Sequence, residues 1–188
     1  MRYKSLIVFL LRRKQSSAFT LIELMVVIAI IGIILVLAIP NFGGMQQQAR
    51  MRAGAQQVAQ DFRQIRERAL SKGLVYTVVF DVAGKRQYTV SYINIHDSLR
   101  SETYRLGSVA GGNLVFGTTG AMSAYPPEGS GSPPVDGVDF ENDICEFDNR
   151  GGADRGVVYI TDNRDNYAIG VNRFGKVKVY RYKNGTWY

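Results

Sequence analysis

The chain has 188 residues, which is enough for one soluble domain with a single core beside its N-terminal segments. Its formal net charge of +7 comes from 23 Lys and Arg against 16 Asp and Glu. Five of the basic residues lie before residue 15, where no acid occurs, and subtracting them from 23 leaves 18 against 16. The overall charge is therefore no evidence for a nucleic-acid-binding protein. The five are Arg2, Lys4, Arg12, Arg13 and Lys14.

The residue inventory argues against an enzyme, a cofactor or a disulfide framework. The chain has one cysteine, Cys145, and one histidine, His96. A single cysteine cannot form an intrachain disulfide, and we expect a buried free thiol. The sequence holds no G-x-S-x-G, P-loop, H-E-x-x-H or C-x-x-C motif, and we expect His96 to lie in a loop. We therefore predict a protein that is not an enzyme and binds no cofactor.

An apolar stretch near the N-terminus predicts a membrane-spanning helix over residues 19–40. Residues 24–39 carry no polar or charged side chain. A helix from Phe19 to Ile39 is roughly 30 Å long, which matches the hydrocarbon core of a bilayer. Arg12, Arg13 and Lys14 precede it and place the N-terminus in the cytoplasm, so the rest of the chain should lie on the other side.

Glu23 is anomalous within this stretch, because a carboxylate near the centre of a membrane helix costs about 2.5–3.5 kcal/mol. An ordinary signal peptide has a shorter apolar region and needs no acid. A plain membrane anchor also leaves Glu23 unexplained. The segment therefore calls for a function that uses the carboxylate.

Residues 18–23, with the sequence AFTLIE, resemble the class III leader junction of type IV prepilins and type II secretion pseudopilins. The resemblance implies that a prepilin peptidase cuts between Ala18 and Phe19, that the new Phe19 amine is methylated, and that Glu23 acts in assembly. Pro40 also stands where such pilins have a proline. The residue before the cut is usually glycine, and here it is Ala18. Residues 1–18 would then be the leader peptide.

Residues 41–73 predict an amphipathic helix that continues the apolar segment beyond a kink near Pro40. Five arginines lie off the apolar stripe, and we expect a solvated face or contacts with other subunits. Gly73 is the predicted stop. The stripe, at spacings of three and four, consists of Met51, Ala55, Val58, Phe62, Ile65 and Ala69.

Residues 74–188 predict a β-rich domain, so the fold class is α+β, with a long N-terminal helix packed on an antiparallel, pilin-like domain. Glycine and proline within residues 117–137 indicate a long surface loop. Strands and hairpins are expected at residues 74–80, 86–95, 156–161, 167–171 and 176–182, with weaker ones at 103–106 and 113–116.

Two charged segments of this domain are candidate binding sites. Seven acids lie within residues 136–154, but their spacing is not that of an EF-hand loop, and we predict no metal site. The second segment is basic and interleaved with Tyr180, Tyr182 and Trp187, so it could contact DNA or protect an edge strand. It contains Arg173, Lys176, Lys178, Arg181 and Lys183.

The helix end at residues 66–73, the hairpin after it and the C-terminal strands resemble the GspH/FimT pseudopilin family. Members typically end with a Gly-Arg-Val-Arg-like strand, and residues 175–178 read Gly-Lys-Val-Lys. The resemblance implies a minor pseudopilin of type II secretion, anchored in the inner membrane with a periplasmic domain. Its partners would be other pseudopilins at a filament tip, the prepilin peptidase and the assembly platform. The alternative is a minor pilin of a type IV pilus that contacts DNA.

Overall fold

The computed structural model describes residues 19–38, 42–84, 86–108, 111, 113–120 and 122–188. The chain divides into two units, with the boundary between Phe42 and Gly43. The predicted leader and Pro40 lie outside the described residues, as does the predicted kink. The first unit contains α1 (Leu21–Ala38), whose described side chains are exposed along the helix. Within the described ranges, no helix combines the length and the apolarity needed to cross a membrane.

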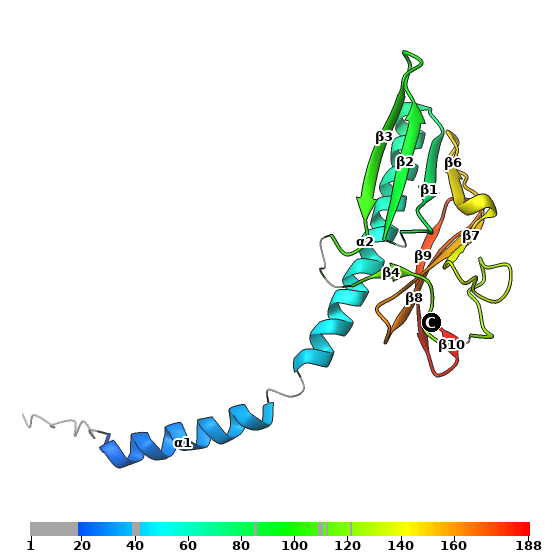
Figure 1. Ribbon diagram of the computed structural model, residues 1–188. Coiled ribbons are helices and arrows are strands. Elements are labelled where there is room, and N and C mark those ends of the chain that lie inside the picture. Colours follow the sequence, from blue (N-terminus) through cyan, green and yellow to red (C-terminus); the bar gives the residue numbers. More distant parts are fainter. Residues whose placement is uncertain (1–18, 39–41, 85, 109–110, 112, 121) are drawn as a thin grey trace, which may run out of the picture. The chain divides into compact units, whose positions relative to one another are not determined.

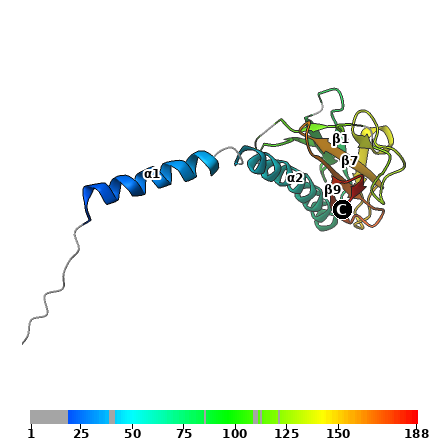
Figure 2. The same cartoon turned by 90° about the horizontal axis from the view of Figure 1, so that it is seen from below.

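The predicted amphipathic helix is α2 (Phe42–Lys72), and its stripe is confirmed. Every stripe residue, from Met51 to Ala69, is at most 2% exposed. Figure 2 shows α2 lying along the β-sheets that this face contacts. The helix stops at Gly73, whose φ of +67° is left-handed, and the Leu74 amide donates to the Ala69 carbonyl at 3.2 Å.

The first sheet is antiparallel, in the order β3-β2-β1-β6 (Figure 1). The strand expected at residues 103–106 is longer and begins at Leu99, because all seven of its residues pair with β2. β6 was missed, since it has only four residues and lies inside the acidic segment, where Glu146 interrupts the apolar residues. The strands are β1 (Tyr76–Phe80), β2 (Gln87–Ile93), β3 (Leu99–Arg105) and β6 (Ile144–Phe147).

The second sheet contains the predicted C-terminal meander, in the order β10-β9-β8-β7-β4, and β5 also pairs with β7. β7 and β8 are buried at every position, which explains why residues 157–160 and 167–171 do not alternate between apolar and polar. The strands are β4 (Val115–Phe116), β5 (Val138–Asp139), β7 (Gly156–Thr161), β8 (Asn166–Val171), β9 (Val177–Lys183) and β10 (Thr186–Trp187).

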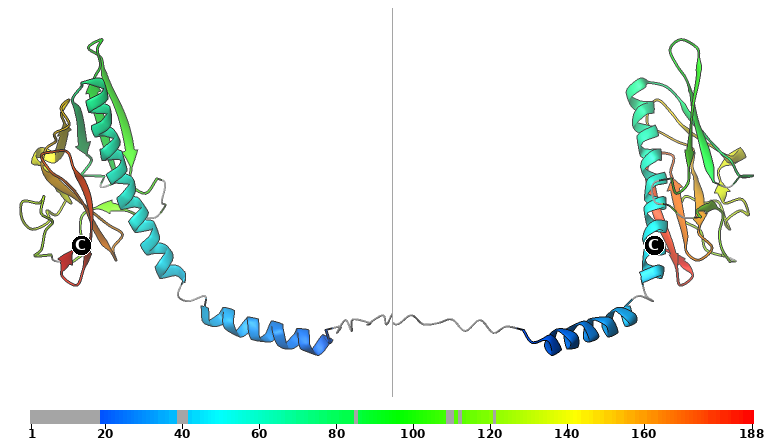
Figure 3. Two further views of the ribbon diagram at one scale, coloured as in Figure 1. Left: turned by 180° about the vertical axis from the view of Figure 1, so that it is seen from behind. Right: turned by 60° about the vertical axis from the view of Figure 1, so that its left-hand side comes forward.

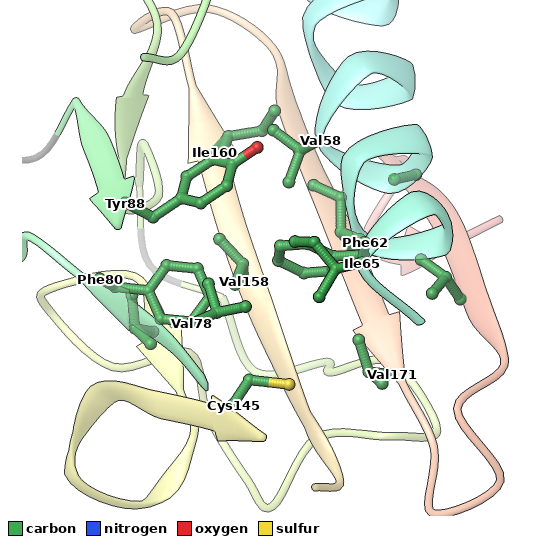
Figure 4. Close-up of a cluster of buried hydrophobic side chains, with 14 of the residues drawn as sticks. Val58, Phe62, Ile65, Val78, Phe80, Tyr88, Cys145, Val158, Ile160 and Val171 are labelled. Carbon is green, nitrogen blue, oxygen red and sulfur yellow. The ribbon is translucent and has the colours of Figure 1, made fainter. Parts of the chain in front are cut away.

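The main core lies where α2 meets both sheets (Figure 4). Phe62 is at its centre, with ring centroids 6.1 Å from Phe80, 5.9 Å from Tyr88 and 6.0 Å from Phe147. The predicted buried free thiol is confirmed, because Cys145 is fully buried among these side chains. Burial raises the pKa of this thiol well above its ordinary value, so Cys145 has a packing role.

The segment between β4 and β5 crosses the outer face of the second sheet instead of extending freely into solvent. The Tyr180 hydroxyl donates to the Glu128 carboxylate at 2.8 Å, and the Trp187 indole donates to the Ala124 carbonyl at 2.9 Å. Arg155 Nη2 donates to the Pro127 carbonyl at 2.8 Å. These contacts cover a second small cluster of buried side chains around Tyr159. The predicted surface loop is thus a strap across the sheet.

Candidate functional site

The start of α1 is organised by Thr20, which precedes the first helical residue. The Glu23 amide donates to Thr20 Oγ1 at 3.3 Å, and the Leu24 amide donates to the Thr20 carbonyl at 3.2 Å. A threonine cap followed three residues later by glutamate has the spacing of a capping box. The T-x-x-E spacing was readable in the sequence, and it gives Glu23 a local role that we had not predicted.

Glu23 lies in the first turn of α1 and is the helix's one charged side chain. A carboxylate there is favoured by the partial positive charge of the helix N-terminus. Within the described residues, every ion pair lies in the globular unit, so Glu23 has no cationic partner among them. Phe19, the predicted first mature residue, is 75% exposed just before the cap. Phe19 and Glu23 thus flank one helix start, and Ala18 and Pro40 lie outside the described residues.

The basic residues of the C-terminal segment do not form one patch. Side chains alternate between the faces of β9, so Lys178 and Arg181 point to opposite sides of the sheet. Arg181 faces α2 with Val177 and Val179, and its Nη2 lies 3.2 Å from Asp165 Oδ1. Lys178 and Lys183 are exposed. The five predicted basic residues therefore lie in separate places. Arg173 and Lys176 are in a turn, Lys178 and Arg181 are on opposite faces of β9, and Lys183 is at its end.

Lys176 is instead close to two arginines of α2 that the sequence analysis did not connect with it. Arg63 Nη2 donates to the Val177 carbonyl at 3.2 Å, and Arg66 Nε donates to the Gly151 carbonyl at 2.8 Å. With Phe174, which is 82% exposed, these residues line a cavity of about 380 Å³. This arrangement could not be predicted from the sequence, because α2 and the turn are far apart in the chain.

Three of the five off-stripe arginines of α2 also make contacts within the chain, which were not expected of a mostly solvated or intersubunit face. Arg63 and Arg66 hold backbone carbonyls, and Arg68 pairs with Glu102 at 3.1 Å. Arg50 and Arg52 are exposed, as expected.

The interpretation of the basic segment as an edge strand is partly correct. β10 pairs only with Tyr182 and Lys183, and the Arg181 and Tyr188 backbones exchange hydrogen bonds of 2.8 and 3.0 Å. In the described part of the chain, no strand pairs with the outer edge of β9 from Val177 to Tyr180. Lys178, which lies on that stretch, fits the protective role of an edge lysine.

The acidic segment uses its carboxylates for local structure. Asp148 accepts the Arg150 and Gly152 amides at 2.7 and 2.8 Å, and these bonds lower the pKa of its carboxyl. Asp154 accepts the Glu146 amide at 2.9 Å. In the described ranges, no three potential ligand side chains come together as they would around a metal ion.

A polar network joins α2 to the first sheet. The Tyr88 hydroxyl donates to Asp61 Oδ2 at 2.5 Å, and the Tyr88 ring stacks on Tyr104 with centroids 5.4 Å apart. Burial raises the pKa of the Asp61 carboxyl, although the Tyr88 bond opposes this. Burial likewise raises the pKa of Tyr88. His96 lies apart from the network, in the exposed β2–β3 turn as expected, and its amide donates to Asn94 Oδ1 at 3.0 Å.

Comparison with known proteins adds evidence for the N-terminal segment. A family model described as the prokaryotic N-terminal methylation motif matches residues 13–39. No curated protein matches the chain in sequence.

Three solved structures are similar to the chain at low identity. Two are of the minor pseudopilin EpsH from the type 2 secretion system of Vibrio cholerae. One has a TM-score of 0.44 and 14% identity and covers 68% of this chain and 94% of its own. The other has a TM-score of 0.45 and 13% identity and covers 70% of this chain and 93% of its own. The third is the type IV minor pilin FimU of Pseudomonas aeruginosa, with a TM-score of 0.46 and 10% identity, covering 72% and 91%.

The methylation motif contains the predicted cut and Glu23, and the globular unit has an α-helix packed on antiparallel sheets, as expected. The chain thus has a prepilin-type N-terminal methylation motif at residues 13–39, followed by a globular unit with the expected α+β fold.

Proposed function

We propose that the chain is a minor pseudopilin, a non-catalytic subunit that assembles into a type II secretion pseudopilus. The observation that carries the proposal is the methylation motif at residues 13–39, with Glu23 in the capped first turn of an apolar helix. In this proposal a prepilin peptidase cuts between Ala18 and Phe19. The Phe19 amine is then methylated and becomes the start of the mature subunit.

The role proposed for Glu23 follows from its position in α1. The carboxylate lies at the first turn, so it would be close to the mature N-terminus of whichever subunit packs there. The amine of Phe19 in an adjacent subunit is cationic and would satisfy this charge in an apolar environment. Each added subunit would then be fixed at one stagger along the filament, set by a single Phe19–Glu23 pair.

The proposed location is the inner membrane, with a cytoplasmic N-terminus and a periplasmic domain. The basic residues Arg12 to Lys14 and the apolar residues 24–39 support this orientation. The apolar segment would hold subunits in the membrane until the assembly platform extracts them. The boundaries we propose are 1–18 for the leader, 19–40 for the anchor, 41–73 for the helix extension and 74–188 for the β-rich domain.

N-terminal mass spectrometry of the protein from its host tests the processing step. We expect a chain that begins at Phe19 and carries one methyl group on its amine. Ala18→Gly, which restores the usual family residue, should be cut at least as completely. Ala18→Glu puts a charge at a position where the family keeps a small residue, and it should leave the chain uncut. A wild-type chain that keeps Met1 would contradict the proposal.

The alternative is a minor pilin of a type IV pilus that receives DNA. It is supported by Lys176, Arg63 and Arg66, which place three cations around one cavity, although Glu67 also lines this cavity and lies 3.9 Å from Arg66. It is weakened by Arg181, which is paired with Asp165 on the other side of the sheet from Lys178. Lysine at residues 176 and 178 keeps the charge but lacks the two-pronged geometry with which arginine binds phosphate.

An electrophoretic shift assay separates the two functions. A pseudopilin should give no salt-sensitive shift of duplex DNA, and its Lys176→Ala/Lys178→Ala variant should behave identically. A pilin that receives DNA should give a shift that weakens as salt rises and is reduced in the double variant. Lys72→Ala is the matched control, because this exposed lysine belongs neither to the predicted DNA-contact set nor to the cavity lining. Identification of co-purifying subunits would provide an independent assignment of the filament.

A further inference from the structure

β3 is the outer strand of the first sheet, and one of its edges is open. All its residues pair with β2, from Leu99 opposite Ile93 to Arg105 opposite Gln87. Among the residues that the structure describes, no strand pairs with the other side of β3. The β2–β3 hairpin projects at one end of the globular unit (Figure 3), so its edge is accessible.

The hydrogen-bond pattern identifies which backbone groups point outward. Antiparallel pairs alternate between pairs that exchange both backbone bonds and pairs that exchange none. At the hairpin end, the Asn94 amide donates to the Ser98 carbonyl at 3.1 Å. At the other end, the Leu106 amide donates to the Arg86 carbonyl at 2.8 Å. The even-numbered residues of β3 therefore bond to β2, and the outward groups belong to Leu99, Ser101, Thr103 and Arg105.

β3 carries the charged residues Arg100, Glu102 and Arg105, which are one protective device of an edge strand, but it lacks several others. The strand has no proline and no lysine, and its register with β2 is continuous, without a bulge. Ser101, one residue before the middle of the strand, is small and exposed and lies between Arg100 and Glu102. Next to it, the exposed Ile93 and Leu99 form an apolar pair across the two strands. The edge thus offers unpaired backbone groups, with a positive residue on one side of Ser101 and a negative residue on the other.

We propose that β3 pairs with β3 of a second copy of the chain, antiparallel about a two-fold axis through Ser101. In this register Ser101 lies opposite Ser101 of the second copy, and Leu99 lies opposite its Thr103. These are odd-numbered residues on both strands, so their outward backbone groups meet. Arg100 then lies opposite Glu102 of the second copy, and the symmetry repeats this opposite-charge pair.

Charge selects this register over its neighbours. Centring the pair on Arg100 or on Glu102 would place like charges opposite each other, which is destabilising. Centring it on Thr103 would remove both Arg100–Glu102 pairs. Glu102 is already held by Arg68 at 3.1 Å and by the Tyr104 hydroxyl at 2.8 Å, so its carboxylate is oriented before the second copy arrives.

The contact is small, and two short strands alone pair weakly in water. The pairing register does not rest on the membrane anchorage proposed above. The processing test by mass spectrometry and the pairing test below can therefore fail separately.

Cysteine trapping in the full-length protein tests the register. Ser101→Cys would place two thiols on the two-fold axis, with Cα atoms about 5.5 Å apart, which is within disulfide range. The native Cys145 is fully buried and should not react. Thr103→Cys is the matched control, because this edge residue is also exposed and would lie about 15 Å from its own copy. Under mild oxidation in detergent micelles, we expect Ser101→Cys to form a covalent dimer at least about tenfold faster than Thr103→Cys.

Two further variants test the chemistry of the pairing. Adding Arg100→Glu to Ser101→Cys puts two glutamates opposite each other and should slow dimer formation severalfold. A mixture of Leu99→Cys and Thr103→Cys chains should form the mixed disulfide. Equal trapping at residues 101 and 103, no trapping at either, or trapping of residue 101 in membranes to a different protein would overturn the proposal.

Discussion

The Glu23→Ala variant is expected to be cut and methylated like the parent but to be lost from the filament. The cut lies five residues before Glu23, so the peptidase should still act at Ala18–Phe19. The variant would present no carboxylate to the Phe19 amine of the adjacent subunit. Crosslinking to partner subunits in the host, with N-terminal mass spectrometry of the same sample, measures both steps. Normal co-assembly of the variant would contradict this role for Glu23.

Two matched variants separate the charge of Glu23 from its place in the capping box. Glu23→Gln keeps a side chain suited to a capping box and removes the charge, so it should fail in assembly as Glu23→Ala does. Thr20→Ala removes the hydroxyl that accepts the Glu23 amide and keeps the charge. It should weaken the helix start by about 1 kcal/mol but still assemble. Assembly by Glu23→Gln and failure of Thr20→Ala would assign Glu23 to helix capping alone.

The Phe62→Ala variant is expected to lose about 3–5 kcal/mol of the free energy of unfolding of the globular unit. The Phe62 side chain is fully buried and contacts aromatic rings from β1, β2 and β6. Its removal leaves a cavity where α2 meets the sheets. A domain of this size has roughly 5–15 kcal/mol in total, so a large part of its stability would be lost.

Urea unfolding of residues 43–188, followed by far-ultraviolet circular dichroism, measures this loss. The unit is suited to the test because its core residues, from Met51 to Val177, all lie within it. Gln60→Ala is the control, since Gln60 is exposed on the same helix and should change stability by less than about 0.5 kcal/mol. A loss below about 1 kcal/mol for Phe62→Ala would contradict the packing described here.

The sequence alone determined those features that depend on local pattern. The spacing of Met51 to Ala69 predicted the buried face of α2, because the period of a helix places such residues on one side. Gly73 predicted its end, because a left-handed residue is easiest for glycine. The meander from Gly156 onward was readable from β-branched residues and turns. The N-terminal motif also needed no structure, since the peptidase and methylation chemistry act on a linear segment.

Only the tertiary structure decided features that depend on partners distant in the chain. β6 has four residues within an acidic segment, and its pairing with β1 brings Cys145 opposite Val78 in the core. The basic C-terminal residues looked like one patch, but strand alternation and Asp165 separate Arg181 from Lys178. Lys176 instead lies with Arg63 and Arg66 of α2. The open edge of β3 likewise depends on strand order, which local propensity does not encode.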